Sequence, residues 1–334
     1  MVTAPPIIDF EPFYSTDPNN KDLLIQQIRH ACERHGFFQL INHQIPSDLL
    51  QAILHQSREV FGLPLEAKEK YSIDIEPRKL GYERLRAQNF EKRGLGDLKE
   101  GFYFCRDLPP DHPSIGRFLH GVNKYPTELH DLAAFRRVVG EYQAAMGELA
   151  RNIMRVIAQS LDLEEHWFDD FCADSANILR LLRYPPQEVD ETGVERGIGA
   201  HTDFGGITIL LQDDTGGLQV WDRESSQWAS VVPFPGALVV NLGNLLMRWT
   251  NDRYLSNLHR VINTSGRERY SVPFFCTGNL DYTVECIPGC RAETEEAKYP
   301  PITVQEWMEK RYADTYGQEG EGELSRDVGR AVDG

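Results

Sequence analysis

The sequence predicts an α+β fold in which a helix-rich first half precedes a strand-rich jelly roll or sandwich. The apolar residues of 22–35 and 129–161 recur every three or four positions, which is the spacing of one helix face. After Asn177 the pattern changes to short apolar runs separated by turns rich in Gly, Pro and Ser. Many short strands with regular turns are typical of jelly rolls and sandwiches. The 334 residues suffice for one large domain or two ordinary ones.

The N-terminal part is expected to hold two helices, one buried strand and long loops. Gly36 ends the first helix, 22–35, because glycine interrupts helices. The apolar run at 37–41 reads as a short buried strand, and Ser47 can cap the helix that follows it. Residues 75–123 are rich in Pro, Gly and charge, so we expect long loops there, of the kind that often form lids or binding loops.

The remainder is expected to be a long helix followed by the strands. The helix at 129–161 packs against the sheet as a supporting spine. The expected strands are 178–184, 207–212, 218–221, 228–231, 237–241 and 269–275. We divide the chain into an N-terminal region with loops or a lid (1–125), a jelly-roll core (126–317) and a polar, Gly- and Glu-rich tail (318–334) expected to be disordered. The first two segments are expected to act as one unit.

The composition excludes several classes of partner. The formal net charge of −16 would repel a phosphate backbone, so we expect no nucleic-acid partner. The chain has no run of about 18 apolar residues, so we expect no membrane span. The start, MVTAPPIIDF, lacks the basic and apolar stretches of a secretory signal, and we expect a cytoplasmic protein.

Cysteine usage favours reduced thiols. The six cysteines form no CxxC pair and are spread along the chain. Cys286 and Cys290 flank a Pro-Gly turn. A structural zinc or a disulfide at this turn is the less favoured alternative.

Two histidines and one aspartate have the spacing of a metal site. His201 and Asp203 lie just before the strand 207–212, and in an extended backbone residues i and i+2 point to the same face. His259 precedes an apolar pair and can begin another strand. Two imidazoles and one carboxylate make the facial triad that suits iron(II) and leaves positions open for substrate and dioxygen. The alternative is that these are ordinary histidines, since an HxD sequence often arises by chance.

A carboxylate-binding pair follows the third histidine. Arg269 and Ser271 share one face of the strand 269–275. A guanidinium donates two parallel hydrogen bonds to a carboxylate, and a hydroxyl adds a third. The same alternation aligns Arg180 with Tyr184 on the strand 178–184, so both cations and the phenol can face one barrel interior. The alternative for Arg269 alone is a surface arginine.

Several motifs in fixed order resemble a known family. HTD (201–203), HR (259–260) and RYS (269–271) are similar to the 2-oxoglutarate/iron(II) dioxygenases of the isopenicillin N synthase-like group. The resemblance covers nearly the whole chain. It includes PIIDF (6–10), ACERHGFFQLINHQIP (31–46), FGLPLEAKEKY (61–71), DLKE (97–100), RYPP (183–186), DDTGGLQVW (213–221) and NLGNLLMRWTND (241–252). Within the group, the barrel motifs are most similar to fungal thymine 7-hydroxylases and their uncharacterised relatives.

The resemblance implies a double-stranded β-helix core, also called a jelly roll or cupin-like fold, and a role for each site residue. It implies that His201, Asp203 and His259 bind iron(II). It implies that Arg269, Ser271 and Tyr184 bind the co-substrate 2-oxoglutarate, and that Arg180, Phe204 and Phe275 line the substrate pocket. Phe204 stands where the thymine 7-hydroxylases have tyrosine, so one hydroxyl is lost. From the loop 75–123, we place Arg84 at the pocket, which Arg86 and Gln88 could also reach; the alternative is a solvated, charged loop.

The function expected is that of an oxygenase that consumes 2-oxoglutarate and dioxygen and releases succinate and carbon dioxide. It would oxidise a C–H bond of a small molecule by hydroxylation, desaturation or cyclisation. A cation between aromatic rings suits a planar or carboxylate-bearing substrate, either amino-acid-derived, as in fungal secondary metabolism, or nucleobase-like. Two alternatives stay open: an oxidase of the isopenicillin N synthase type, which uses no 2-oxoglutarate, and a non-catalytic binding protein on the same fold.

Overall fold

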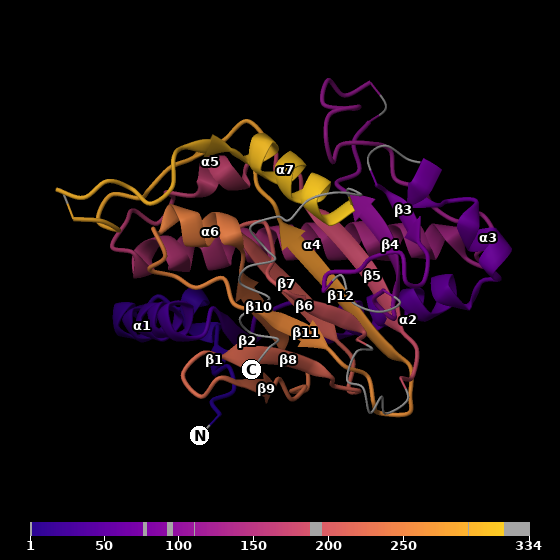
Figure 1. The fold of residues 1–334 in the computed structure, drawn as a ribbon, viewed down its shortest axis with the longest axis horizontal. Coiled ribbons are helices and arrows are strands. Elements are labelled where there is room, and N and C mark those ends of the chain that lie inside the picture. The colour runs from indigo at the N-terminus through magenta and orange to yellow at the C-terminus, as the bar shows by residue number, and fades with distance from the viewer. Residues whose placement is uncertain are drawn as a thin grey trace.

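The computed structural model describes residues 2–75, 79–91, 96–109, 111–187, 196–292 and 294–316. Two facing sheets form its centre (Figure 1). The larger sheet has the order β1 (Ile7–Asp9), β2 (Phe37–Ile41), β10 (Leu238–Leu242), β7 (Ile207–Gln212), β12 (Arg269–Cys276), β5 (Ile178–Tyr184), β4 (Glu100–Cys105), β3 (Gly81–Glu83). The smaller sheet has the order β6 (Ile198–His201), β11 (His259–Val261), β8 (Leu218–Asp222), β9 (Gln227–Ser230). The predicted α+β fold with a jelly-roll core is confirmed.

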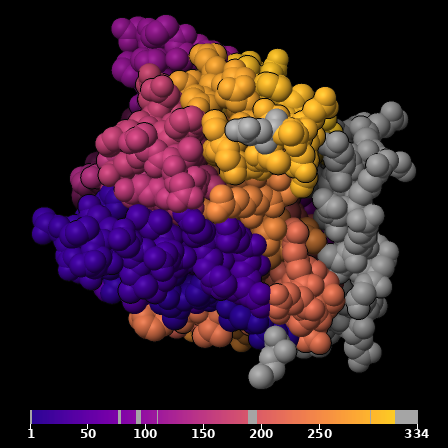
Figure 2. All heavy atoms as spheres, turned by 90° about the vertical axis from the view of Figure 1, so that its left-hand side faces the viewer, coloured from indigo at the N-terminus to yellow at the C-terminus, as the bar shows by residue number. Residues whose placement is uncertain are grey.

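Helices α1 (Pro18–Arg34), α2 (Ser47–Gly62) and α4 (Leu132–Ser160) pack against the larger sheet. The other helices are α3 (Leu65–Glu69), α5 (Asp169–Cys172), α6 (Asn244–Trp249) and α7 (Val304–Tyr316), with two 3-10 turns at Glu11–Tyr14 and Ile73–Ile75. A short pair, β13 (Thr283–Val284) and β14 (Ile302–Thr303), precedes α7. Figure 2 shows the N-terminal helices against the region of α4 and α5, with the C-terminal region above them. No helix in the described ranges has the length and apolarity to cross a membrane.

The helix boundaries have local causes. Asp17 caps α1 by accepting a hydrogen bond from the Asn19 amide, and Pro18 occupies the first helical position, where no amide donor is needed. Asp131 caps α4 in the same way through the Ala134 amide. Helix α1 gives way to Gly36, whose φ of +64° suits glycine. A Cβ there would lie 2.2 Å from the Leu255 carbonyl oxygen, so the close approach also requires glycine.

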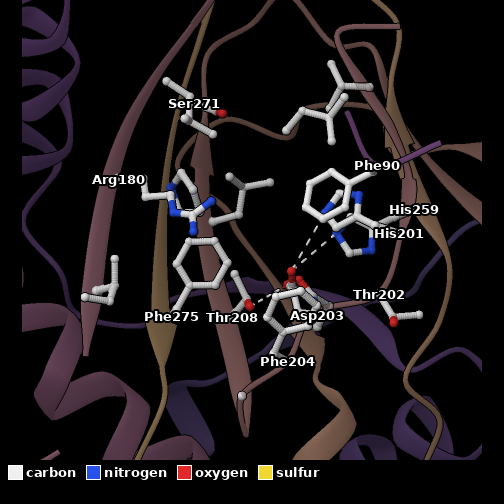
Figure 3. A pocket seen from close by; sticks show the side chains of 18 of the residues that line it. Phe90, Arg180, His201, Thr202, Asp203, Phe204, Thr208, His259, Ser271 and Phe275 are labelled. Carbon is white, nitrogen blue, oxygen red and sulfur yellow. Dashed lines mark hydrogen bonds and ion pairs between the residues drawn. The ribbon is translucent and has the colours of Figure 1, made fainter. Parts of the chain in front are cut away.

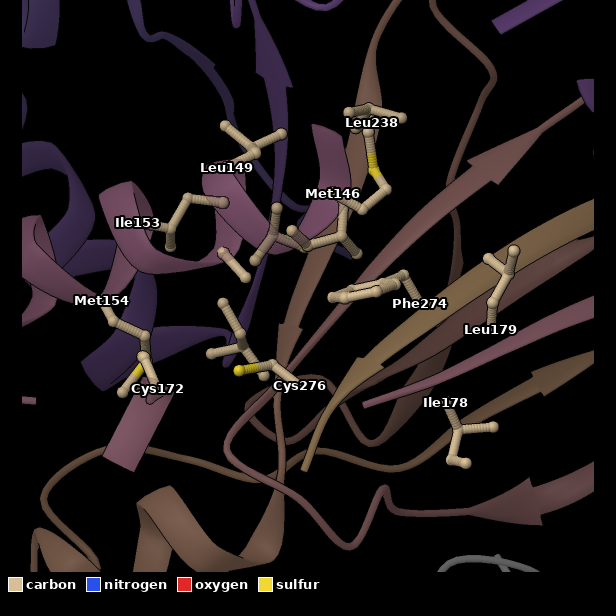
Figure 4. Close-up of a cluster of buried hydrophobic side chains, with 14 of the residues drawn as sticks. Met146, Leu149, Ile153, Met154, Cys172, Ile178, Leu179, Leu238, Phe274 and Cys276 are labelled. Atoms are coloured by element: carbon tan, nitrogen blue, oxygen red, sulfur yellow. The ribbon is translucent and has the colours of Figure 1, made fainter. Parts of the chain in front are cut away.

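Two buried layers hold the sheets in place. On the outer face, Met146, Leu149 and Ile153 of α4 pack near Leu179 and Phe274 of the sheet (Figure 4), which confirms the expected supporting helix. The second layer lies between the two sheets. It consists of Phe37, Tyr103, Leu182, Tyr184, Ile198, Leu218, Val220, Val231, Val239 and Val261, together with Ile73. This inner layer surrounds the pocket described below.

The expectation of long loops at 75–123 is wrong in part. Strands β3 and β4 lie within this range, and every residue of β4 is buried. Strand β4 pairs with β5, while β2 pairs with β10, so the segments 1–125 and 126–317 share one sheet. The surrounding Gly and charged residues concealed β4 because only its FYF core is apolar. The expected disordered tail, 318–334, lies outside the described residues.

The six cysteines all lie in the described ranges as unbridged thiols, and four of them are buried. Cys286 and Cys290 are half-buried free thiols.

Candidate active site

One pocket opens between the two sheets, and its walls carry most of the site residues expected from the sequence. Strands β5, β6, β7, β10, β11 and β12 contribute side chains, and α7 closes one side through Met308 and Tyr312. Figure 3 shows Arg180 and Phe275 across the pocket from His201 and His259. The chemistry of each wall follows from the residues on it.

Strand pairing brings the three candidate metal ligands together. His259 pairs with His201 across β11 and β6, so the two imidazoles lie side by side with ring centroids 4.2 Å apart. Asp203 Oδ1 is 3.8 Å from His201 Nε2 and 3.9 Å from His259 Nε2. One ligand atom from each residue lies within 4.8 Å of the others. At this separation, a single metal ion could bind one ligand atom from each of the three residues.

Both imidazoles have their second nitrogen committed to the backbone. His201 Nδ1 is 2.8 Å from the Gly199 carbonyl oxygen, and His259 Nδ1 is 3.2 Å from that of Asn257. A carbonyl can only accept, so Nδ1 carries the proton and Nε2 has a lone pair available for a metal ion. Burial and the neighbouring His259 lower the pKa of His201, which favours the neutral imidazole that metal binding requires.

The carboxylate of Asp203 is held by one of its two oxygens. Its Oδ2 accepts hydrogen bonds from Thr208 Oγ1 at 2.5 Å and from Asn241 Nδ2 at 2.8 Å. Burial alone would raise the pKa of Asp203, but the adjacent histidines and these two donors hold the pKa below its usual range. Asp203 is thus ionised, with Oδ1 left for a metal ion. This donor set fits iron(II), which takes two imidazoles and one carboxylate on one face.

A fully buried arginine forms a second polar end of the pocket. Arg269 is 0% exposed and lies 4.7 Å over the ring of Tyr184. Its Nε donates to the Gly216 carbonyl at 2.7 Å, and its Nη2 donates to Gln212 Oε1 at 3.2 Å. Its Nη1 is buried without a hydrogen-bond partner among the described residues. A buried cation with a donor to spare, beside the buried Ser271, fits the far carboxylate of 2-oxoglutarate.

The opposite wall is aromatic around a second cation. The Arg180 guanidinium lies 4.3 Å from the Tyr103 ring centroid and 4.9 Å from that of Phe275. Phe204 also lines the pocket, and its carbonyl accepts a hydrogen bond from Trp307 of α7 at 2.9 Å. Across the pocket, Phe90 stacks on His201 with centroids 4.4 Å apart (Figure 3). The pocket therefore offers aromatic faces and a second cation to a ligand.

Arg84 does not lie at this site, and placing it in the pocket was wrong. Its side chain is 62% exposed and pairs with Asp74 at 3.2 Å, and it is not among the residues that line the cavity. Gln88, which was considered together with Arg84, does line the pocket, and so does Phe90 from the same loop. The direction of a loop side chain has no periodicity to predict it. The α7 residues were also missed, because that helix is more than a hundred residues from the HTD motif.

Comparison with known proteins decides the family. A family model described as "2OG-Fe(II) oxygenase superfamily" matches residues 174–278, and one described as "non-haem dioxygenase in morphine synthesis N-terminal" matches residues 5–128. The 2-oxoglutarate-Fe(II) type oxidoreductase hxnY of Emericella nidulans is 47% identical over 95% of this chain and 91% of its own length. The chain belongs to the 2-oxoglutarate/iron(II)-dependent oxygenase family. It is an enzyme of the dioxygenase type that uses iron(II), 2-oxoglutarate and dioxygen.

Other relatives and structures agree with this assignment. The 2-oxoglutarate-dependent dioxygenase citB of Monascus ruber is 40% identical, covering 93% of this chain and 95% of its own. The crystal structure of Neurospora crassa thymine 7-hydroxylase in complex with alpha-KG and thymine has a TM-score of 0.82 at 30% identity, covering 93% of this chain and 96% of that one. The resemblance to fungal thymine 7-hydroxylase, inferred from the barrel motifs, is confirmed.

Proposed function

We propose that this dioxygenase binds iron(II) through His201, Asp203 and His259 and binds the far carboxylate of 2-oxoglutarate through Arg269, Ser271 and Tyr184. One observation supports both parts. The pocket that contains three clustered ligand atoms also contains the buried Arg269, whose Nη1 has no acceptor in the described part of the chain. A buried cation that lacks an anion is costly, and a carboxylate co-substrate supplies that anion.

The residues of the chain position the reactants and keep water out. When bound, iron(II) with 2-oxoglutarate and dioxygen supplies the oxidation of a substrate C–H bond, while 2-oxoglutarate becomes succinate and carbon dioxide. Arg269 orients the co-substrate by fixing the end farthest from the metal. Asp203 and the two imidazoles would hold the ion, and a donor set of this kind leaves positions for the co-substrate and dioxygen. Phe37 and Leu210 give the pocket apolar walls that exclude water.

We propose a small planar substrate that presents a carboxylate or carbonyl group to Arg180. Its ring would lie against Phe275 and Phe204, while the bond to be oxidised faces the metal ligands. Thymine, bound in the complex of the Neurospora crassa enzyme, is a planar molecule of this size class. Amino-acid-derived and nucleobase-like compounds both satisfy these contacts. Hydroxylation, desaturation and cyclisation would all begin at the same C–H bond.

Product analysis under oxygen tests the proposal. The purified enzyme would be supplied with iron(II), 2-oxoglutarate and a panel of planar acids and pyrimidines, and succinate would be measured against oxygen consumed. Substrate-dependent succinate formation is expected, and Arg269→Met should abolish it at low 2-oxoglutarate concentration. Oxygen consumption with substrate but without succinate would contradict the proposal and favour an oxidase of the isopenicillin N synthase type. Ligand binding without turnover would favour a binding protein.

A further inference from the structure

Strand β7 contacts both ends of the proposed co-substrate site. Along an extended strand, residues i, i+2 and i+4 face the same side, so Thr208, Leu210 and Gln212 share one face. Thr208 and Leu210 line the pocket. Thr208 hydrogen-bonds Asp203, as Figure 3 shows, and Gln212 hydrogen-bonds Arg269. One strand therefore contacts a candidate metal ligand and the guanidinium expected to bind the far carboxylate.

The metal end of β7 is a buried clamp on Asp203. Thr208 pairs directly with Asn241 across β7 and β10, and both side chains are buried. Together they donate to Oδ2 at 2.5 and 2.8 Å. With Oδ2 occupied twice, the carboxylate can turn only Oδ1 toward the two imidazoles. The clamp therefore favours binding through a single oxygen.

The other end of β7 fixes the rotation of the Arg269 guanidinium. Gln212 pairs with Ser271 across β7 and β12, so its side chain lies beside that serine. Its Oε1 accepts from Nη2, while the Gly216 carbonyl accepts from Nε. These two acceptors occupy one edge of the guanidinium and leave Nη1 available. The Gln212 Nε2 atom is itself buried without a partner among the described residues, so a carboxylate or a water held there would gain a second donor.

We infer that β7 is a positioning strand in which Thr208, assisted by Asn241, orients the metal carboxylate and Gln212 orients the co-substrate arginine. Four residues of strand span about 13 Å, so β7 fixes the separation of the two anchors by its own rigid geometry. The inference rests on the proposed function, because it assumes that Asp203 binds iron and that Arg269 binds 2-oxoglutarate. Thr208 acts through Asp203 and Gln212 acts through Arg269, so both are positioning residues.

Two nearly isosteric variants separate the two roles. Thr208→Val removes only the hydroxyl donor, and Gln212→Met removes the amide while keeping a chain of similar length. Metal affinity would be measured anaerobically by titrating iron(II) without 2-oxoglutarate. Affinity for 2-oxoglutarate would be measured at saturating iron(II) by titrating the iron-to-co-substrate charge-transfer absorbance. Thr208→Val should weaken iron(II) binding about 10- to 100-fold, the usual effect of losing a partner of a metal ligand. Gln212→Met should weaken 2-oxoglutarate binding about tenfold and leave iron(II) affinity unchanged.

Rescue variants and folding controls make the outcome decisive. Thr208→Ser retains the hydroxyl and should restore most of the iron(II) affinity. Gln212→Glu places a carboxylate beside Arg269 and should weaken 2-oxoglutarate binding more than Gln212→Met does. Thermal unfolding of each variant would establish that it is folded before titration. Wild-type iron(II) affinity in folded Thr208→Val, or equal losses of both affinities in Gln212→Met, would overturn the inference.

The parent proposal fails in a different way. If Arg269→Met bound 2-oxoglutarate as tightly as the wild type, the assignment of Arg269 itself would be wrong. If Arg269→Met lost 2-oxoglutarate while Gln212→Met kept it, the arginine would stand and only the role of Gln212 would be refuted.

Discussion

Replacing Lys99 with methionine should destabilise the folded protein strongly, and by less as the pH falls. Lys99 Nζ forms an ion pair with Glu83, and both side chains are only 1% exposed. Glu83 also accepts a hydrogen bond from Tyr103, whose ring supports Arg180 in the substrate pocket. Breaking a buried pair by removing one partner typically costs about 3–5 kcal/mol. We expect a loss at the lower end, about 3 kcal/mol at neutral pH, since Tyr103 still donates to the carboxylate.

The pH dependence identifies the cause. Burial alone would raise the pKa of Glu83, but Lys99, Arg180 and the hydrogen bonds hold it below the usual value of 4.5. A carboxyl with a lowered folded pKa stabilises the wild type above about 4.5, and this contribution is lost as the pH falls through the folded pKa. Without Lys99, burial prevails and the pKa of Glu83 rises. The variant can then relieve its buried charge by protonation, at up to about 1.4 kcal/mol per pH unit.

Urea unfolding of the wild type and Lys99→Met, followed from about pH 8 down to about pH 5, would measure this effect. The matched control is Lys70→Met, because Lys70 pairs with Glu128 at 2.6 Å but is 63% exposed. That exposed pair should contribute less than about 1 kcal/mol. The double variant Glu83→Gln/Lys99→Met should recover part of the stability lost in Lys99→Met. A Lys99→Met protein within about 0.5 kcal/mol of the wild type, or a stability deficit that grows on acidification, would contradict a stabilising role for the buried ion pair.

Three further predictions concern the site. His201→Ala and Asp203→Ala should each abolish stoichiometric iron(II) binding and succinate formation while retaining the fold, and unchanged turnover in either would rule out the metal assignment. Arg180→Met should raise KM for carboxylate-bearing substrates at least about tenfold with little change in 2-oxoglutarate affinity, because a charge-assisted bond is lost only on the substrate side. Steady-state kinetics would measure KM, and the anaerobic titration would measure the affinity for 2-oxoglutarate. Equal weakening of substrate and 2-oxoglutarate binding would contradict a role for Arg180 on the substrate side alone. Gly243→Ala would put a Cβ 2.2 Å from the Gly205 carbonyl oxygen, in the loop that follows Asp203. It should lower both the thermal unfolding temperature and iron(II) affinity, and a normal value of either would show that the loop can move aside.

The sequence predicted the elements whose side chains follow a simple period. The strands Ile178–Tyr184 and Ile207–Gln212 have the expected bounds, because their apolar runs end at clear turn residues. The helix expected at 129–161 is observed at Leu132–Ser160, since its apolar face repeats without interruption. The short strand β6 was missed, because its four residues, IGAH, contain only one large apolar side chain. Strand pairing, rather than composition, determines that this segment is extended.

The structure brings together the candidate ligands that the sequence singled out, while the side chains that contact them through strand pairing were missed. His201 and Asp203 are two residues apart, so local geometry alone places them on one face. Thr208 lies on an expected strand and Asn241 begins a recognised motif, but their bonds to Asp203 depend on the register of β7 against β10, which no local pattern specifies. The same holds for Gln212, whose role depends on its position opposite Ser271. Tertiary pairing therefore supplies the residues that orient the ligands.

The most direct test of this two-part site is an anaerobic titration of the purified enzyme with iron(II) and then 2-oxoglutarate, followed by the charge-transfer absorbance. One iron(II) per chain and one 2-oxoglutarate per iron are expected. The absorbance should be abolished in His259→Ala, and in Arg269→Met it should develop only at much higher 2-oxoglutarate concentration. An absorbance that develops normally in both variants would contradict the claim that these residues form one site.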